Sequence, residues 1–199
     1  NTAYSIDMTD HGSAAASSLM TALRTTYDAS IAIGYSPLVS TSIYCGDYSK
    51  QQLLWVMAGN YAVSQGEYTG AELRQMMEWL VNVKDNGANP IRHRNYMPVT
   101  SGMEYKVTEY EQGKFRLEEL TVNGAPLDDT ATYTVFVAGT DVWIENEVYC
   151  SCPMPENLKT KRTEYAIEGA DSRSCLKDSL AVSKQFPAPS EYLTIVQGE

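Results

Sequence analysis

Residues 69–81 hold the feature that most constrains the fold, a helix start followed by one apolar face. Thr69 and Glu72 form a capping box, in which each side chain can accept a hydrogen bond from the other residue's backbone N–H. Apolar residues then recur at the spacing of a single helical stripe: Leu73, Met76, Met77, Leu80 and Val81. Because a helix with one apolar face must bury that face, the segment predicts a helix packed on a core.

The residues before this helix predict a short strand. Tyr61 and Val63 are expected on one side of it, with Ala62 and Ser64 on the other. Gln65-Gly66 then predicts a turn between the strand and the helix. A strand that leads into a packed helix is most often a piece of core.

The rest of the chain mixes helices and strands. Residues 13–27 predict a helix, and Ser49 with Gln52 forms a second capping box that opens a short helix ending near Val56. Strands are predicted at 30–33, 103–110, 114–122, 133–137 and 191–196, of which the second and third form a hairpin. Since there is no regular β-α-β alternation, we predict an α+β fold with a mixed sheet and packed helices.

The length of 199 residues fits one domain. We expect residues 1–149 to form its core and residues 150–199 to add a polar excursion and a closing segment of the same domain. Within the excursion only a strand at 164–167 is predicted. The start at Asn1, with no charged-then-apolar leader, predicts a mature or engineered boundary.

Composition and charge exclude several classes of function. A formal net charge of −10 repels phosphate backbones, so nucleic acid is not an expected partner. No run of about 18 apolar residues occurs, so no membrane span is expected. Fourteen tyrosines and three tryptophans supply flat faces that can stack on a base or a sugar, although most should simply complete the core.

The residue inventory gives little support for catalysis or metal binding. With two histidines in the chain and Cys150 and Cys152 spaced too closely for a zinc pair, no metal site is predicted. A disulfide from Cys150 or Cys152 to Cys175 would close a loop and stabilise the folded state by about 3 kcal/mol. The alternative is that these cysteines are reduced, buried thiols. Cys45 is the fourth cysteine. The sequence contains no nucleophile elbow and no phosphate-binding glycine loop, so we predict no catalytic residue in this chain.

Short segments between residues 13 and 140 carry a resemblance. They are the helix and strand at 13–33, Cys45-Gly-Asp-Tyr-Ser49, Gly59-Asn60, Thr69-Gly-Ala-Glu-Leu73, Val99-Thr-Ser-Gly-Met103, and Val122–Asp128 followed by Tyr133-Thr-Val. In order and spacing these segments resemble the C-terminal domain of the bacterial 5′-nucleotidase, UDP-sugar hydrolase and 2′,3′-cyclic phosphodiesterase family. The resemblance covers about two-thirds of the chain.

The resemblance implies a division of labour. Family members are extracytoplasmic hydrolases in which an upstream two-metal phosphatase domain performs the chemistry. The C-terminal domain supplies a substrate pocket, with two aromatic rings around the base and with arginines and an asparagine holding the rest. For this chain it implies an upstream metallophosphatase domain as partner and a nucleotide or nucleoside as ligand. Divalent metals are expected only in that other domain, with no cofactor here.

The chain departs from the family where the pocket is expected. Ala58 stands at the position of a stacking phenylalanine, the loop at 34–39 lacks the family's arginine, and residues 140–146 replace its glycine-rich run. Only Asn60 carries over directly, and Tyr61 or Trp143 could stack in compensation. The candidate substrate-binding residues are Asn60, Tyr61, Trp143 and Asn146. Losing one stacking face weakens binding by about 1–3 kcal/mol, so affinity for nucleotides should be weak.

Two functions from different classes remain open. The first is the substrate-recognition domain of a 5′-nucleotidase-like metallophosphoesterase, inactive by itself and located outside the cytoplasm. The alternative is a non-catalytic module of a secreted or surface protein that binds a carbohydrate or a protein.

Overall fold

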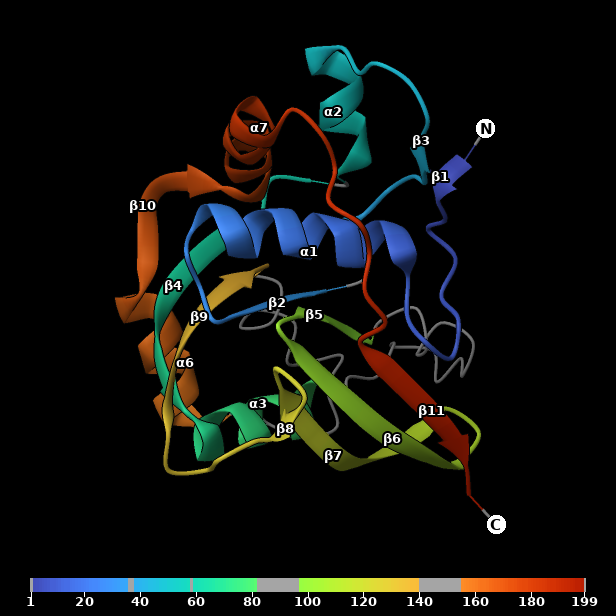
Figure 1. Ribbon diagram of the computed structural model, residues 1–199. Coiled ribbons are helices and arrows are strands. Elements are labelled where there is room, and N and C mark those ends of the chain that lie inside the picture. Colours follow the sequence, from blue (N-terminus) through green and yellow to red (C-terminus); the bar gives the residue numbers. More distant parts are fainter. Residues whose placement is uncertain (1, 36–37, 58, 82–96, 140–154, 199) are drawn as a thin grey trace.

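Two mixed sheets form the framework of the chain in the computed structural model, which describes residues 2–35, 38–57, 59–81, 97–139 and 155–198 (Figure 1). The five-stranded sheet has the order β10-β4-β9-β2-β5. Its strands are β10 (Ala166–Asp171), β4 (Ala62–Thr69), β9 (Thr132–Ala138), β2 (Ile31–Tyr35) and β5 (Pro98–Ser101). Strands β2 and β9 are parallel, and the other neighbours are antiparallel.

The second sheet has four strands in the order β11-β6-β7-β8. They are β11 (Leu193–Gln197), β6 (Met103–Glu111), β7 (Lys114–Val122) and β8 (Ala125–Pro126). The predicted hairpin is therefore confirmed as β6 and β7, and the predicted closing strand as β11, which pairs parallel with β6. A separate two-stranded ribbon joins β1 (Thr2–Tyr4) to β3 (Ile43–Tyr44).

Helices cover the five-stranded sheet from two directions. They are α1 (Ala14–Thr26), α2 (Lys50–Val56), α3 (Gly70–Val81), α6 (Glu156–Glu164) and α7 (Ser172–Ser183). Helix α1 packs against β2 and β5, and α7 packs on the outside of α1 (Figure 1). Helix α3 lies between the two sheets, where it contacts β4, β5 and β7. The predicted α+β fold with a mixed sheet is confirmed.

The predicted helix starts are confirmed as well. The backbone N–H of Thr69 donates to Glu72 Oε2 at 2.8 Å, and that of Glu72 donates to Thr69 Oγ1 at 3.2 Å. All five residues of the predicted α3 stripe are buried. Ser13 caps α1, and Ser49 with Gln52 forms the capping box of α2.

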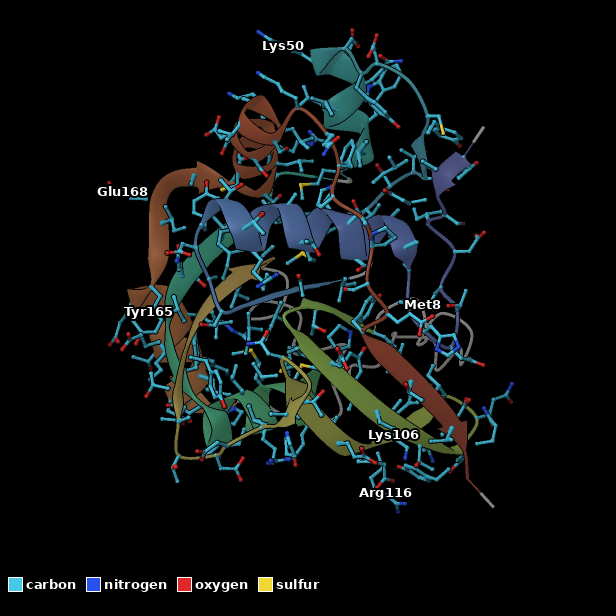
Figure 2. The ribbon with its side chains drawn as sticks, viewed as in Figure 1. Met8, Lys50, Lys106, Arg116, Tyr165 and Glu168 are labelled. Atoms are coloured by element: carbon cyan, nitrogen blue, oxygen red, sulfur yellow. The ribbon has the colours of Figure 1, made fainter. Side chains whose placement is uncertain are left out.

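The predicted turn at Gln65-Gly66 is wrong. Strand β4 runs unbroken through both residues, and each pairs with a residue of β9. Glycine is needed because the half-buried ring of Tyr165 lies directly on the strand there: a Cβ at Gly66 would be 1.9 Å from Tyr165 Cδ2. Figure 2 labels Tyr165, which follows α6. A glycine inside a strand can mark such a close approach as well as a turn.

The strand predicted at 164–167 exists with shifted bounds, and the two helices around it were not predicted. Residues 156–183 form α6, β10 and α7 in succession, and β10 begins at Ala166. Helix α6 buries only Leu158 and Arg162, and β10 is an edge strand, so neither needs a strong apolar pattern. The predicted core boundary at residue 149 lies outside the described residues.

The C-terminal segment is bound onto α1 by small polar residues. Ser17 Oγ donates to the Ser190 carbonyl at 2.7 Å, and Ser18 Oγ donates to the Pro187 carbonyl at 2.6 Å. The backbone N–H of Ser13 donates to the hydroxyl of buried Tyr192 at 3.0 Å. The small residues at the start of α1 therefore allow the closing segment to approach the helix.

Two cysteines lie within the described residues. Cys175 is a free, buried thiol on α7, and Cys45 is a free, exposed thiol. Burial raises the pKa of the Cys175 thiol despite a hydrogen bond with Tyr27. Cys150 and Cys152, the two alternative partners of Cys175 in the predicted disulfide, lie outside the described residues.

The Glu72 carboxylate, which caps α3, should make the stability of the domain depend on pH. Burial raises the pKa of Glu72, but hydrogen bonds from Lys161 and Thr69 outweigh it, and the pKa falls below the ordinary 4.5. Lys161 Nζ lies 2.7 Å from Glu72 Oε2 and ties α6 to the start of α3. Because the folded-state pKa is depressed, this contribution is complete above pH 4.5 and is lost as the pH falls through the folded-state pKa.

Glu72→Gln keeps a capping side chain but removes the charge, so we expect a loss of about 1 kcal/mol in unfolding free energy at neutral pH. Urea denaturation of both proteins across pH checks this, since the difference between them should shrink once Glu72 is protonated in the folded state. A difference that is constant down to low pH would contradict the role of the carboxylate.

Candidate binding edge of the five-stranded sheet

All five strands of the larger sheet start or end at one edge. Strands β2, β9 and β10 end there, at Tyr35, Ala138 and Asp171, and β4 and β5 begin there, at Ala62 and Pro98. The strand register establishes this, because the paired residues are Tyr35 with Pro98, Ile33 with Val137, and Val63 with Ala138. We call this the binding edge, meaning the side of the sheet where its strands start or end and not the flank formed by an outer strand. Asn60 lies beside the ends of β2 and β9, the strands that precede the two other pocket segments expected from the sequence. Of those segments, residues 36–37 and 140–146 lie outside the described residues.

Two of the four candidate residues can be placed. Asn60 is exposed immediately before β4. Tyr61 is partly buried, packs against the core, and lays its ring across Gly59, where a Cβ would be 3.1 Å from Tyr61 Cε2. Trp143 and Asn146 lie outside the described residues, as does Ala58. The structure therefore places Asn60 and Tyr61 at the binding edge, and the substrate-binding role of all four residues stays a prediction.

The segment that carries Asn60 is held by the start of α7. Ser172 donates its backbone N–H to the Tyr61 carbonyl at 2.9 Å, and its hydroxyl accepts from the Tyr61 N–H at 3.1 Å. The same hydroxyl donates to the Gly59 carbonyl at 3.2 Å. The Arg173 guanidinium donates from Nε and Nη2 to the Met57 carbonyl, at 3.3 and 3.0 Å. Asn60 is thus positioned by hydrogen bonds that Ser172 and Arg173, more than a hundred residues away, make to the backbone of residues 57–61.

The sequence analysis missed Ser172 and Arg173. One local signal was available: Asp171 and Ser174 form the capping box of α7, with the Ser174 N–H donating to Asp171 Oδ1 at 2.8 Å. Leu176 and Leu180 then follow at helical spacing. That signal could have located the helix, but not the contact with residues 57–61, which is purely tertiary.

We expect Ser172→Ala to cost about 1–3 kcal/mol of unfolding free energy, because the fully buried hydroxyl serves both the Tyr61 N–H and the Gly59 carbonyl. Hydrogen exchange should locate the change, with protection lost at the Tyr61 amide. Ser183→Ala on the same helix is the control, since Ser183 is exposed. Equal effects of the two changes would contradict the anchoring role.

Among the groups with strongly shifted pKa, Tyr105 is fully buried and donates its hydroxyl to the Pro98 carbonyl at 2.7 Å, whereas Tyr68 and Arg162 lie away from the binding edge. Burial raises the pKa of Tyr68 to about 12, and burial lowers the pKa of Arg162 to about 10. Tyr68 pairs with Tyr133, near the opposite end of β4 from Asn60. The Arg162 guanidinium lies 5.9 Å from the centre of the Trp79 ring. These shifts follow from packing in the core and provide no acid or base at the edge.

The binding edge offers recognition groups. The Asn60 amide can donate and accept hydrogen bonds, and an aromatic ring lies next to it. Within the described ranges, no group of three or more His, Cys, Asp or Glu side chains could hold a metal ion. None of the described helices is long and apolar enough to cross a bilayer.

Comparison with known proteins decides the family. The profile of the family described as "5′-nucleotidase, C-terminal domain" matches residues 5–140. The chain belongs to that family. No curated protein matches it significantly in sequence.

Solved structures of the family's wider group share the fold. A 5′-nucleotidase precursor from Thermus thermophilus is 19% identical with a TM-score of 0.64, covering 94% of this chain and 36% of that one. The NAD nucleotidase of Haemophilus influenzae is 12% identical with a TM-score of 0.70, covering 95% and 34%. A putative 5′-nucleotidase from Staphylococcus aureus is 16% identical with a TM-score of 0.62, covering 91% and 36%. The chain thus spans about a third of the length of the proteins that it resembles.

In this 5′-nucleotidase C-terminal domain, the family profile ends at residue 140, whereas the structural matches cover more than nine-tenths of the chain. Residues 155–198 supply β10 to one sheet and β11 to the other, and α7 anchors the Asn60 segment. The region beyond the profile therefore helps to build the binding edge.

Proposed function

We propose that this chain is the substrate-recognition domain of a 5′-nucleotidase-like metallophosphoesterase. The observation that carries the proposal is the binding edge, where β2 and β9 end and β4 begins beside exposed Asn60. Membership of the 5′-nucleotidase C-terminal domain family supports it. So does the chain's length, about a third of the whole proteins that share its fold.

In this proposal the chain binds and orients a nucleotide or nucleoside but does not cleave it. The Asn60 amide holds the ligand by hydrogen bonds, and Tyr61 or Trp143 stacks on the base, with Asn146 as a further contact. The proposal assigns the two divalent metals to an upstream catalytic domain, which would hydrolyse a phosphoric monoester. The protein would work outside the cytoplasm, on the cell surface, in the periplasm or in the medium.

Binding to the isolated chain should be weak. The sequence lacks the family's stacking phenylalanine at Ala58 and its arginine in residues 34–39. Each lost stacking or ionic contact removes on the order of 1–3 kcal/mol, so we expect a millimolar dissociation constant.

Titration of the chain with AMP, followed by amide chemical shifts, tests the proposal. Shifts should concentrate at Ala62 and Gly139, which flank the binding edge, and Asn60→Ala should weaken binding about five-fold. Asn157→Ala is the matched control, because Asn157 is an exposed asparagine on α6 and should change nothing. Micromolar binding that survives Asn60→Ala and Trp143→Ala would overturn the site assignment, and shifts confined to another surface would do the same.

A further inference from the structure

We propose that Arg173 recognises the phosphate of a nucleotide at the binding edge, so that the chain prefers nucleotides to nucleosides. Such a role rests on the proposed function and narrows it, because the phosphate is the part of a nucleotide that a nucleoside lacks. Arg173 is the second residue of α7 and is partly buried where the start of that helix meets residues 57–61. Asn60 belongs to that same segment.

The Arg173 guanidinium is held in place but still has donors to offer. Its Nε and Nη2 atoms donate to one acceptor, the Met57 carbonyl, at 3.3 and 3.0 Å. A guanidinium carries five N–H donors in one plane, so three remain after these two bonds. Because the two bonds restrict the orientation of the plane, the remaining donors need little further ordering to bind a ligand.

Arg173 has no acidic partner within the described parts of the chain. Other cations there lie against carboxylates: Arg74 is 2.8 Å from Asp129, and Lys161 is 2.7 Å from Glu72. Acidic residues outnumber lysines and arginines in the chain by 25 to 15, so a cation without a carboxylate is a distinctive feature. A partly buried guanidinium whose charge is not neutralised attracts an anion, and its planar donors match the oxygens of a phosphate.

Arg173 and Asn60 are close enough to contact a single ligand. Arg173 is bonded to Met57, three residues before Asn60, and the chain between these two Cα atoms can span at most roughly 11 Å. That span is comparable with the length of a nucleoside monophosphate. Ser172 is bonded on the other side of Asn60, to the N–H and the carbonyl of Tyr61. In this arrangement the Asn60 amide meets the base or the sugar while the guanidinium meets the phosphate.

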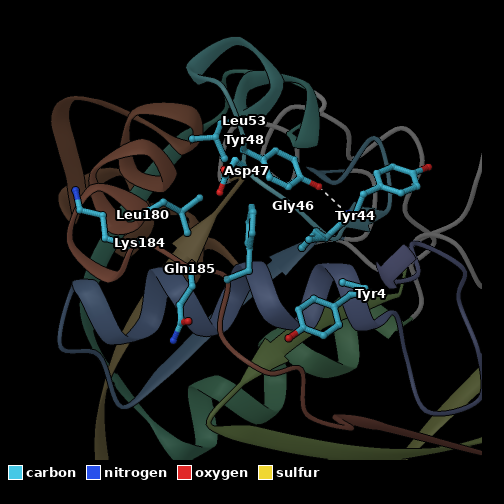
Figure 3. Close-up of a pocket in the computed structure, with 12 residues that line it drawn as sticks. Tyr4, Tyr44, Gly46, Asp47, Tyr48, Leu53, Leu180, Lys184 and Gln185 are labelled. Carbon is cyan, nitrogen blue, oxygen red and sulfur yellow. Dashed lines mark hydrogen bonds between the residues drawn. The ribbon is translucent and has the colours of Figure 1, made fainter. Parts of the chain in front are cut away.

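A pocket at the other end of α7 offers no equivalent site. It has a volume of about 530 Å³ and lies among the β1–β3 ribbon, the start of α2 and the C-terminal end of α7 (Figure 3). The side chain of Lys184 points away from Tyr48 in Figure 3, and Asp47 adds a carboxylate to the wall. Because that carboxylate would repel a phosphate, the start of α7 is the better place for an anion.

Titration of the chain with AMP and, separately, with adenosine tests the assignment. The two ligands differ only in the phosphate, and we expect AMP to bind about five-fold more tightly at low ionic strength. The Arg173 Nε–H resonance should shift with AMP and not with adenosine. Added salt should narrow the difference in affinity, because salt screens a partly exposed ion pair.

Arg173→Gln separates phosphate recognition from a purely structural role. We expect it to weaken AMP binding about five-fold and adenosine binding less than two-fold, whereas loss of the Met57 contacts alone would weaken both equally. Arg173→Lys keeps the charge and should retain part of the preference for AMP. Arg116→Gln on β7 is the matched control, because it removes the same charge from an exposed arginine of the other sheet and should change neither affinity.

The outcomes distinguish this assignment from the proposed function. Equal affinities of the unaltered chain for AMP and adenosine would overturn the role of Arg173 and leave nucleoside recognition standing. A preference for AMP that survives Arg173→Gln would overturn it too, and equal losses for both ligands would leave Arg173 only the positioning of Asn60. If neither ligand shifts the amides of Ala62 and Gly139, the proposed function fails, and the phosphate contact fails with it.

Discussion

Gly70→Ala should destabilise the domain by about 3 kcal/mol, although alanine is the better helix former by about 1 kcal/mol. Gly70 is buried at the first position of α3, and a Cβ there would lie 2.1 Å from the Asp128 carbonyl oxygen and 2.8 Å from Asp129 Cα. Both are backbone atoms, so no side chain can rotate away. Two hydrogen bonds hold the start of α3 this close to residues 128–131. The Gly70 N–H donates to the Ala131 carbonyl at 3.0 Å, and the Ala71 N–H donates to the Asp129 carbonyl at 3.0 Å.

Urea denaturation measures this effect, with a shifted midpoint and an unchanged slope expected for a folded variant. Gly169→Ala on β10 is the control, because Gly169 has φ +73° but open space around its Cβ position. This variant should lose only about 1 kcal/mol of unfolding free energy, because alanine is strained in the left-handed conformation. A neutral or stabilising Gly70→Ala would show that helix propensity governs this position and that the contact between α3 and residues 128–131 is not tight.

Phe136→Ala should cost about 4 kcal/mol of unfolding free energy, the typical loss for a large buried aromatic side chain. Phe136 is fully buried on β9, at the middle of the five-stranded sheet. Its ring stacks on Tyr27 at the end of α1, with centres 4.8 Å apart and planes at 29°. Removing it leaves a cavity between the sheet and α1, because the surrounding strands cannot close the gap.

Phe136→Leu separates the cavity from the loss of the aromatic pair, and we expect it to cost about 1.5 kcal/mol. Val182→Ala, on an exposed face of α7, should stay within about 0.5 kcal/mol. Denaturation by urea and by heat should rank the three variants in this order. A cost for Phe136→Ala as small as that for Val182→Ala would contradict the central position of β9.

Local chemistry explains which elements were predictable. The capping boxes of Thr69 with Glu72 and of Ser49 with Gln52 use residues three apart, so they can be recognised without knowing the fold. The β6–β7 hairpin reverses at Gly113, which has φ +73° as its position requires, and its inward residues alternate with charged ones. Each of these elements has its cause within a few residues.

Distant contacts explain what was missed. Gln65-Gly66 looks like a turn, but Gly66 is fixed by a ring that arrives from residue 165. Strand β10 lies at a sheet edge and α6 buries few apolar side chains, so neither shows a clear periodicity. The candidate site divides in the same way: Asn60 follows from a motif, while Ser172 and Arg173 follow only from the packing of α7 on residues 57–61.

The sequence by itself determined the family resemblance, the α+β class and the helix starts, since these depend on residue type and short spacing. Only the tertiary structure decided that the strands of the larger sheet share one edge beside Asn60, and that α7 holds the Asn60 segment. The physical reason is that pairing and burial join residues far apart in the chain. No local pattern encodes which of these residues will meet.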